Sequence, residues 1–372
     1  MAGGVLDPFD EGAEARAALC DWLALQAALA LRPGLAAALL RRRPDPRAAL
    51  AGAGLEPPPP RELERARRAL RRAGARAVPF GAPLYPWRLL RLPDAAPLLL
   101  VRGEPEVLSA PALAVVGSRA ATVYGLAAAR WFAGELARAG LTIVSGLAFG
   151  IDAAAHRAAL EAGGRTVAVQ ACGPDRVYPA AHRALADEIA RRGAVVSELP
   201  PGSAALRWHF PLRNRLISGL SCAVLVIEGR ERSGSLITAR HALEQGIDVF
   251  ALPGPITAPT SAGPNRLLFD GATPALDPAH VLEALGQRCA TPAERAARAA
   301  AEQAGAAPPG RSAAQARILK ALARAPATRD ELALALGLAP QQLALDLLEL
   351  ELAEAVALDR DGRLRVVAGG GC

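Results

Sequence analysis

The sequence has little of what a metal or disulfide protein needs. Its five cysteines, at positions 20, 172, 222, 289 and 372, include no C-x-x-C pair, and no histidine cluster accompanies them. This pattern excludes a zinc ribbon and a disulfide framework, and we expect no metal site.

Targeting and membrane signals are also missing. The first residues carry acids, among them Asp7 and Asp10, in place of the basic start of a signal peptide. The longest early apolar stretch is bounded by Asp21 and Arg32 and is too short to cross a bilayer. We therefore expect a cytoplasmic protein with no membrane partner.

Lysine is nearly absent, since Lys320 is the one lysine among 43 basic residues. Such a skew, beside abundant alanine, glycine and proline, is typical of a genomic composition bias. The position of the charge is more informative. Residues 41–76 hold eleven arginines against four acids, an excess equal to the chain's net charge of +7. A localised basic segment suits nucleic acid or another anionic surface, although a solvated helix face explains it equally well.

A repeated strand-then-helix unit occupies residues 112–285. The spacing between successive strands is close to the length of one βα unit, about 30 residues. Short apolar runs of this kind are expected where both faces of a strand are buried. The chain is therefore predicted to be an α/β protein with a doubly wound, Rossmann-like parallel sheet. The six predicted strands centre near Leu113, Thr142, Val167, Val195, Val224 and Val249.

Segments of different composition flank this core. Residues 1–76 show helical Ala/Leu/Arg patterns and are predicted to be a helical domain, SAM- or helix-hairpin-helix-like, ahead of the core at 77–285. Residues 286–311 are predicted to be a linker. Residues 312–372 are predicted to be a winged helix, with a capping box at Thr328 and Glu331. Its third helix is acidic and apolar, which favours a protein contact or a structural role over entry into a DNA groove.

Gly-Ser turns follow three of the predicted strands. The carboxyl ends of parallel strands are where open α/β sheets bind ligands, and N–H groups at helix starts attract anions. Arg119 strengthens this signal, because an arginine beside a helix N-terminus costs stability unless an anion binds next to it. Simple tight turns and helix caps are the alternative interpretation. The predicted phosphate-binding residues are Gly117, Ser118, Arg119, Ser145, Gly146, Ser233, Gly234 and Ser235.

The fingerprints of common small ligands are absent. There is no G-x-G-x-x-G, no acid at the end of the second strand to hold a ribose, and no P-loop. Dinucleotides and nucleoside triphosphates are therefore disfavoured, and we expect no cofactor.

An aromatic and basic segment spans residues 208–218. Rings beside cations are typical of a single-strand site, where each stacked base contributes about 1–3 kcal/mol. A loop whose aromatics enter the core explains the composition equally well. The residues singled out are Phe210, Arg213, Asn214 and Arg215.

Asp152 and His156 are four residues apart and share a helix face, as a catalytic pair would. No Ser or Cys nucleophile in an elbow context accompanies them, which favours a structural role. We therefore predict no catalytic residue here.

Taken in order, these motifs resemble the DNA-processing protein A family (DprA, also called Smf). The resemblance covers about residues 80–275 and includes Asp175–Pro179 and His209–Arg215. It implies a non-enzymatic protein of natural transformation that binds and protects incoming single-stranded DNA, loads RecA recombinase, and forms a homodimer. It also implies that Arg119 holds a phosphate and that Phe210 stacks on a base. By the same resemblance, Arg213, Asn214 and Arg215 line the groove.

Two positions depart from the family pattern: His182 stands where Asn is frequent, and Phe149 is large for its slot. Two other functions are alternatives for this pattern. One is an enzyme of the lysine-decarboxylase-like group, whose Pro-Gly-Gly-x-Gly-Thr loop is replaced here by residues 232–235. The other is a sensor of a small nucleotide, against which the arginine and aromatic segment favours a longer ligand.

Overall fold

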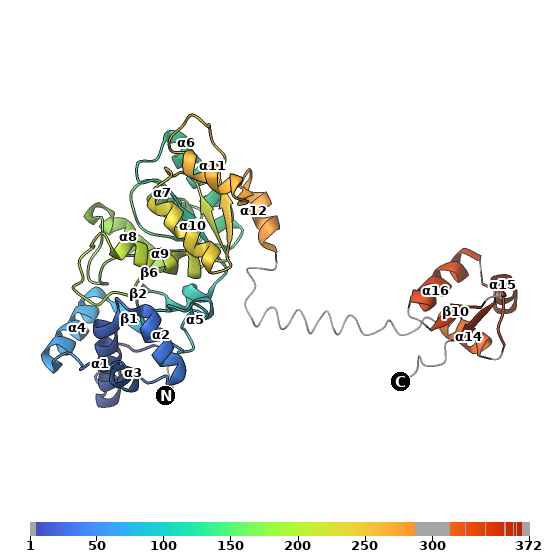
Figure 1. The fold of residues 1–372 in the computed structure, drawn as a ribbon, viewed down its shortest axis with the longest axis horizontal. Helices are drawn as coiled ribbons and strands as arrows, with labels where there is room; N and C mark the ends of the chain where they lie inside the picture. Colours follow the sequence, from blue (N-terminus) through green and yellow to red (C-terminus); the bar gives the residue numbers. More distant parts are fainter. Residues whose placement is uncertain are drawn as a thin grey trace. The chain divides into compact units, whose positions relative to one another are not determined.

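A computed structural model of the chain describes residues 5–286 and, with short gaps, residues 313–366. Contacts divide the chain into two compact units, Met1–Thr291 and Pro292–Cys372, and each is described by itself (Figure 1). The predicted linker, residues 286–311, lies outside the described residues except for Gly286.

The first unit is built on one sheet of nine strands in the order β1-β2-β6-β5-β4-β3-β7-β8-β9. Strands β3 to β9 pair in parallel, whereas β1 and β2 extend the edge beside β6 with antiparallel pairing. The strands are β1 (Ala75–Pro79), β2 (Leu98–Gly103), β3 (Ala112–Val116), β4 (Thr142–Ser145), β5 (Thr166–Val169), β6 (Ala194–Ser197), β7 (Ala223–Val226), β8 (Asp248–Ala251) and β9 (Thr273–Pro274).

The six predicted strands are β3 to β8, which confirms the doubly wound α/β fold. The sequence did not predict β1, β2 and β9. Strand β9 has two residues, and β1 has a single β-branched residue, Val78, and ends in Pro79, so neither gives a clear strand signal. The apolar run at Leu98–Val101 is visible in the sequence, but it lies outside the regular βα spacing.

Successive residues of each central strand pack on opposite faces of the sheet, as the pleat requires. Leu113 and Val115 of β3 pack with α6 (Val123–Arg138), α7 (Ile151–Glu161) and α12 (Pro278–Leu285). Ala114 and Val116 pack on the other side with α9 (His209–Gly219) and α10 (Gly234–Glu244). The remaining helices of this part are α5 (Trp87–Leu90), α8 (Arg183–Arg192) and α11 (Ala262–Phe269), with short 3-10 turns at Pro105–Ser109 and Ala180–His182.

Four N-terminal helices lie beside β1 and β2 (Figure 1). They are α1 (Ala13–Leu29), α2 (Pro33–Arg42), α3 (Pro46–Gly52) and α4 (Pro60–Ala73). Leu25 and Leu29 of α1 are fully buried in the same cluster as Val196 of β6. Buried Gln26 donates from Nε2 to the Glu198 carbonyl at 3.0 Å. These helices therefore share a core with the sheet, and the domain boundary at residue 76 stays a prediction.

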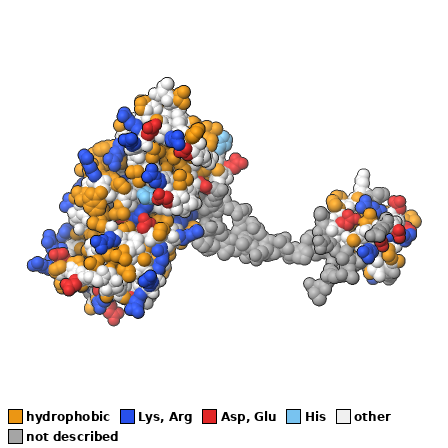
Figure 2. All heavy atoms as spheres, in the orientation of Figure 1, with side chains coloured by type: hydrophobic (Ala, Val, Ile, Leu, Met, Phe, Trp, Pro, Cys, Tyr) orange, Lys and Arg blue, Asp and Glu red, His pale blue; other side chains and the backbone are white. Residues whose placement is uncertain are grey.

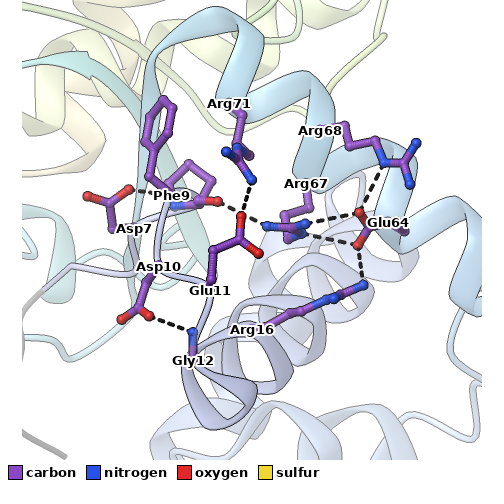
Figure 3. A network of polar contacts seen from close by, with 11 residues as sticks. Asp7, Phe9, Asp10, Glu11, Gly12, Arg16, Glu64, Arg67, Arg68 and Arg71 are labelled. Carbon is purple, nitrogen blue, oxygen red and sulfur yellow. Dashed lines mark hydrogen bonds and ion pairs between the residues drawn. The ribbon is translucent and has the colours of Figure 1, made fainter.

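Several arginines of the basic N-terminal segment are paired within the fold (Figure 3). The Glu64 carboxylate accepts from Arg16, Arg67 and Arg68 at 2.9–3.1 Å. Arg71 pairs with Glu11 on the same side of α4. Hydrogen bonds from Arg67, helped by those from Arg68, lower the pKa of Glu64 to about 2. These contacts favour the structural interpretation for this part of the segment.

The second unit is a winged helix, as predicted. Its helices are α14 (Ala313–Leu322), α15 (Arg329–Leu336) and α16 (Pro340–Leu352), and β10 (Val356–Leu358) pairs antiparallel with β11 (Leu364–Val366). The predicted capping box opens α15: Thr328 accepts from the Glu331 N–H, and the Glu331 carboxylate accepts from the Thr328 N–H. Leu332, Leu347 and Val356 are buried in its core.

Within the described residues, no single helix is long and apolar enough to cross a membrane. One bent pair, Arg329–Leu336 with Gln341–Leu348, passes that test by length and composition alone.

Candidate functional site

The sheet reverses its strand order between β3 and β7, because β3 lies between β4 on one side and β7 on the other. Open α/β sheets bind ligands at this switch point, outside the carboxyl ends of the strands. A cavity of about 780 Å³ lies there, between the turn that follows β3 and the turn that follows β7. We call it the switch-point cavity.

Most of the predicted site residues come together in this cavity. They come from the turns after β3 and β7 and from helix α9. The first and the last of them are more than a hundred positions apart in the sequence. Those that line it are Gly117, Ser118, Arg119, Phe210, Arg213, Asn214, Ser233, Gly234 and Ser235.

The Arg119 guanidinium lies over the Phe210 ring, with its carbon 4.9 Å from the ring centre. The ring of Tyr178, which also lines the cavity, meets Phe210 edge-on at 5.6 Å. A cation over an aromatic face is attracted by the ring's negative face. One exposed cation and two partly exposed rings thus form a connected group in the cavity lining.

The turn after β7 presents two hydroxyls. Ser233 is the N-cap residue of α10, yet its hydroxyl does not cap the helix and lies 2.7 Å from the Ser235 hydroxyl. Asn214 holds this turn by donating from Nδ2 to the Gly234 carbonyl at 3.2 Å. The uncapped helix start and the serine pair face the cavity together, which suits an anion.

Arg213 lines the cavity from a buried position. Its guanidinium donates to the Gly146 carbonyl at 2.8 Å and to the Val169 carbonyl. Gly146 is a glycine because a Cβ there would lie 2.6 Å from the guanidinium. Burial lowers the pKa of Arg213 to about 10, so it stays charged at neutral pH. Gly146 therefore acts by admitting Arg213, although it does not itself line the cavity.

Ser145 also lies outside the cavity lining. Its side chain is fully buried, and its hydroxyl donates to the Val115 carbonyl at 2.6 Å. This bond ties the end of β4 to β3, so the structure favours a positioning role.

Arg215 points into the protein instead of lining the groove, contrary to the expectation from the resemblance. Its guanidinium donates to both oxygens of Glu198 at 2.8 and 2.6 Å, and its Nε lies 3.0 Å from Asp94. The side chain is 2% exposed. Arg213 and Arg215 are two positions apart on α9 and therefore project from different sides of the helix.

The predicted site residues did not include four arginine and tyrosine residues of the cavity lining. Arg207, Arg230, Arg232 and Tyr178 line the cavity and are exposed. Their signal was proximity to the motifs, since each lies within a few positions of a predicted site residue or inside a quoted motif. With Arg119 and Arg213 the lining holds five arginines against one acid, Asp152. On the face drawn in Figure 2, basic side chains of the first unit outnumber acidic ones.

Glu228 is a positioning residue that the motifs did not reveal. It is 2% exposed and lies two positions after the end of β7. Its carboxylate accepts from the Thr122 N–H at 2.9 Å and from the Thr122 hydroxyl at 2.5 Å. The Thr122 hydroxyl in turn accepts from Gly125 N–H and caps α6. Glu228 thus fixes the loop that carries Arg119.

The structural role predicted for Asp152 and His156 fits the geometry. Asp152 Oδ2 accepts from the N–H groups of Gly146 and Ala148 and so shapes the turn before α7. His156 is fully buried, with Nδ1 2.7 Å from the Thr166 hydroxyl. Burial lowers the pKa of His156 to about 3. The histidine does not line the cavity.

The two departures from the family pattern contact each other. The Phe149 ring meets the His182 ring edge-on at 4.8 Å. His182 Nδ1 lies 2.9 Å from the carbonyl of Leu147, whose φ of 59° is in the left-handed region. Gly150, at φ 74°, lies so close to the Ser118 carbonyl that a Cβ would be 2.2 Å from its oxygen. The 146–150 turn is therefore packed tightly against the loop that carries Arg119.

Among the described residues, no group of three or more His, Cys, Asp or Glu could hold a metal ion. The fold and the site together define a Rossmann-like protein with a basic, aromatic-lined cavity at its switch point and a separate winged-helix unit.

Comparison with known proteins gives the family. The family model described as DNA recombination-mediator protein A matches residues 76–286, and the DprA winged helix domain matches residues 299–362. The chain belongs to the DNA recombination-mediator protein A family.

Individual relatives agree. DNA processing protein DprA of Bacillus subtilis is 41% identical over 228 residues, which is 61% of this chain and 77% of that protein. Protein Smf of Escherichia coli is 48% identical over 209 residues, and the match spans 56% of each chain.

Two solved structures are similar. The X-ray structure of DprA from Streptococcus pneumoniae has a TM-score of 0.57 and 39% identity, over 64% of this chain and 82% of that one. DprA from Helicobacter pylori, reported for its single-stranded DNA binding mode, has a TM-score of 0.51 and 31% identity, over 54% and 92%.

Proposed function

We propose that this protein binds single-stranded DNA in the switch-point cavity, and that it protects incoming strands during recombination and natural transformation. The observation that carries the proposal is the group formed by Arg119, Phe210 and Tyr178 beside the serine turn at 233–235. Cations hold phosphates, and exposed rings stack on bases. In a duplex the bases are already stacked and paired, so these rings favour a single strand.

A longer ligand suits the cavity better than a single nucleotide. Four exposed arginines line it: Arg119, Arg207, Arg230 and Arg232. None of them forms an ion pair with a carboxylate in the part of the chain that the structure describes. Four unpaired cations exceed what one phosphate needs, and they match several links of a strand. We also propose that the protein is not an enzyme, since buried Asp152 and His156 serve the turn and the core.

The same proposal has three further parts. The protein hands the strand to RecA recombinase, acts as a homodimer and works in the cytoplasm. Membership of a family described as recombination mediators supports the hand-over to a recombinase. The homodimer rests on the family resemblance, and the cytoplasmic location rests on the expectation from the sequence.

The test compares a single-stranded oligonucleotide with its duplex across a salt series, using fluorescence anisotropy. We expect preference for the single strand and a linear fall of log affinity with log salt. Arg119→Ala should weaken binding at least tenfold and reduce the salt slope by about 0.7, the value for one phosphate contact on a single strand.

Arg138→Ala is the matched control, because Arg138 lies on α6 outside the cavity and pairs with Glu135. Equal affinity for both DNA forms, or equal behaviour of the two variants, would contradict the proposal.

A further inference from the structure

A second cavity, of about 540 Å³, adjoins the same 146–150 turn. Ala148 lines the switch-point cavity, whereas the next two residues, Phe149 and Gly150, line the second cavity. The segment at 178–182 crosses in the same way, because Tyr178 lines the first cavity and His182 lines the second. The two cavities are therefore neighbours, separated only by the width of these chain segments.

Phe149 is a half-exposed ring in this second cavity. It is 49% exposed, although removing an apolar ring from water is ordinarily favourable. His182, 5% exposed, supports the ring edge-on at 4.8 Å and is itself held by the Leu147 carbonyl. The ring is thus oriented by a buried neighbour while about half of it stays open to a ligand.

Basic side chains accompany the ring. Arg130 of α6 and Arg157 of α7 line the same cavity, and both are exposed. Neither forms an ion pair among the residues that the structure describes. Glu161 is the one acid in this lining, so the local balance is positive. The combination of an open ring and free guanidinium groups repeats that of the switch-point cavity, on residues from different parts of the chain.

We propose that the second cavity is a further subsite for the same DNA strand, in which Phe149 stacks on a base and Arg130 and Arg157 contact the flanking phosphates. This inference rests on the proposed function, since the strand must first occupy the switch-point cavity. A strand that passes over Ala148 and Tyr178 reaches Phe149 directly. The ligand is therefore a continuing polynucleotide and not a free nucleotide.

The experiment measures the affinity of the full-length protein for oligothymidylates of increasing length. Short oligomers that fill only the switch-point cavity should bind Phe149→Ala as tightly as the parent. Beyond a threshold length the parent should gain affinity and Phe149→Ala should not, with a difference of about 5- to 150-fold for one lost stack. Arg130→Ala combined with Arg157→Ala should remove the same gain and flatten the salt slope of long oligomers only.

Two controls separate stacking from packing. Phe149→Leu keeps apolar volume against His182 without an aromatic face, so it should retain the fold and still lose the length-dependent gain. Phe269→Ala removes an 81% exposed ring outside both cavities and should change nothing. With 5-iodouracil in a long oligomer, photocrosslinking should label the peptide that contains Phe149.

The outcomes distinguish this inference from the proposed function. If Arg119→Ala weakens every length while the Phe149 variants match the parent at every length, the second subsite is wrong and the proposed function stands. If Phe149→Ala weakens all lengths by one factor and Phe149→Leu restores them, the ring only packs the turn and the subsite is again wrong. If Arg119→Ala has no effect at any length, the proposed function fails first.

Discussion

The carbon of the Arg119 guanidinium lies 4.9 Å from the centre of the Phe210 ring, although the two residues come from a turn after β3 and from α9. This contact joins the two motifs that the sequence presents separately. It also means that a phosphate on Arg119 and a base on Phe210 would belong to adjacent parts of one ligand.

Because the two side chains touch, their contributions to DNA affinity should be coupled. Phe210→Ala should weaken single-strand binding about 5- to 150-fold through the lost stack. The double variant with Arg119→Ala should lose less than the sum of the single losses, by at least about 0.5 kcal/mol, since each single change already disturbs the cation–ring contact. Anisotropy titrations of the four proteins give this double-mutant cycle. Strictly additive losses would show that the contact has no part in binding.

Arg215 should matter for stability and not for DNA. Arg215→Met leaves Glu198 buried without its main partner, which should lower the free energy of unfolding by about 3–5 kcal/mol. Adding Glu198→Leu should recover much of this loss, because no buried charge is then stranded. Urea denaturation measures both effects. The folded variants should bind DNA with an affinity within twofold of the parent's. A loss of affinity without a loss of stability would indicate that Arg215 contacts the DNA, contrary to this assignment.

Acid should weaken the cluster around Glu64. Its pKa is about 2 in the folded protein against an ordinary value of 4.5, so the carboxylate stabilises the fold fully above pH 4.5. That contribution is lost as the pH falls from 4.5 to 2. Glu64→Gln should therefore be less stable than the parent at pH 7, and the difference should vanish near pH 2. Thermal unfolding across this range is the measurement, with Glu62→Gln on the same helix as control. A difference that does not change with pH would contradict the assignment.

The parallel strands were predictable because each is a short apolar run at regular spacing, and the switch-point turns follow from where those runs end. Gly117, Ser118 and Arg119 reach the cavity for that reason alone. The edge strands β1 and β9 were not predictable, since an edge strand needs no continuous apolar run and β9 has only two residues.

Side-chain direction was the harder part of the site. Arg213 and Arg215 look alike in sequence, yet the first lines the cavity and the second pairs with Glu198, 17 positions earlier, and with Asp94, more than a hundred positions earlier. Ser145 similarly bonds to β3 instead of a ligand. Only the three-dimensional arrangement of these distant partners decides which polar residues remain free for DNA.

The two ends of the nine-stranded sheet offer little to a further strand. At one end β9 is only two residues long, and Pro274 has no N–H to donate. At the other, β1 ends in Pro79 and already bonds Leu6 through Ala77. Unpaired strand edges are templates for joining sheets between molecules, and here both are blunted. A second copy of this unit would therefore have to associate through side chains on helices and loops, and the sheet itself would not continue from one molecule into the next.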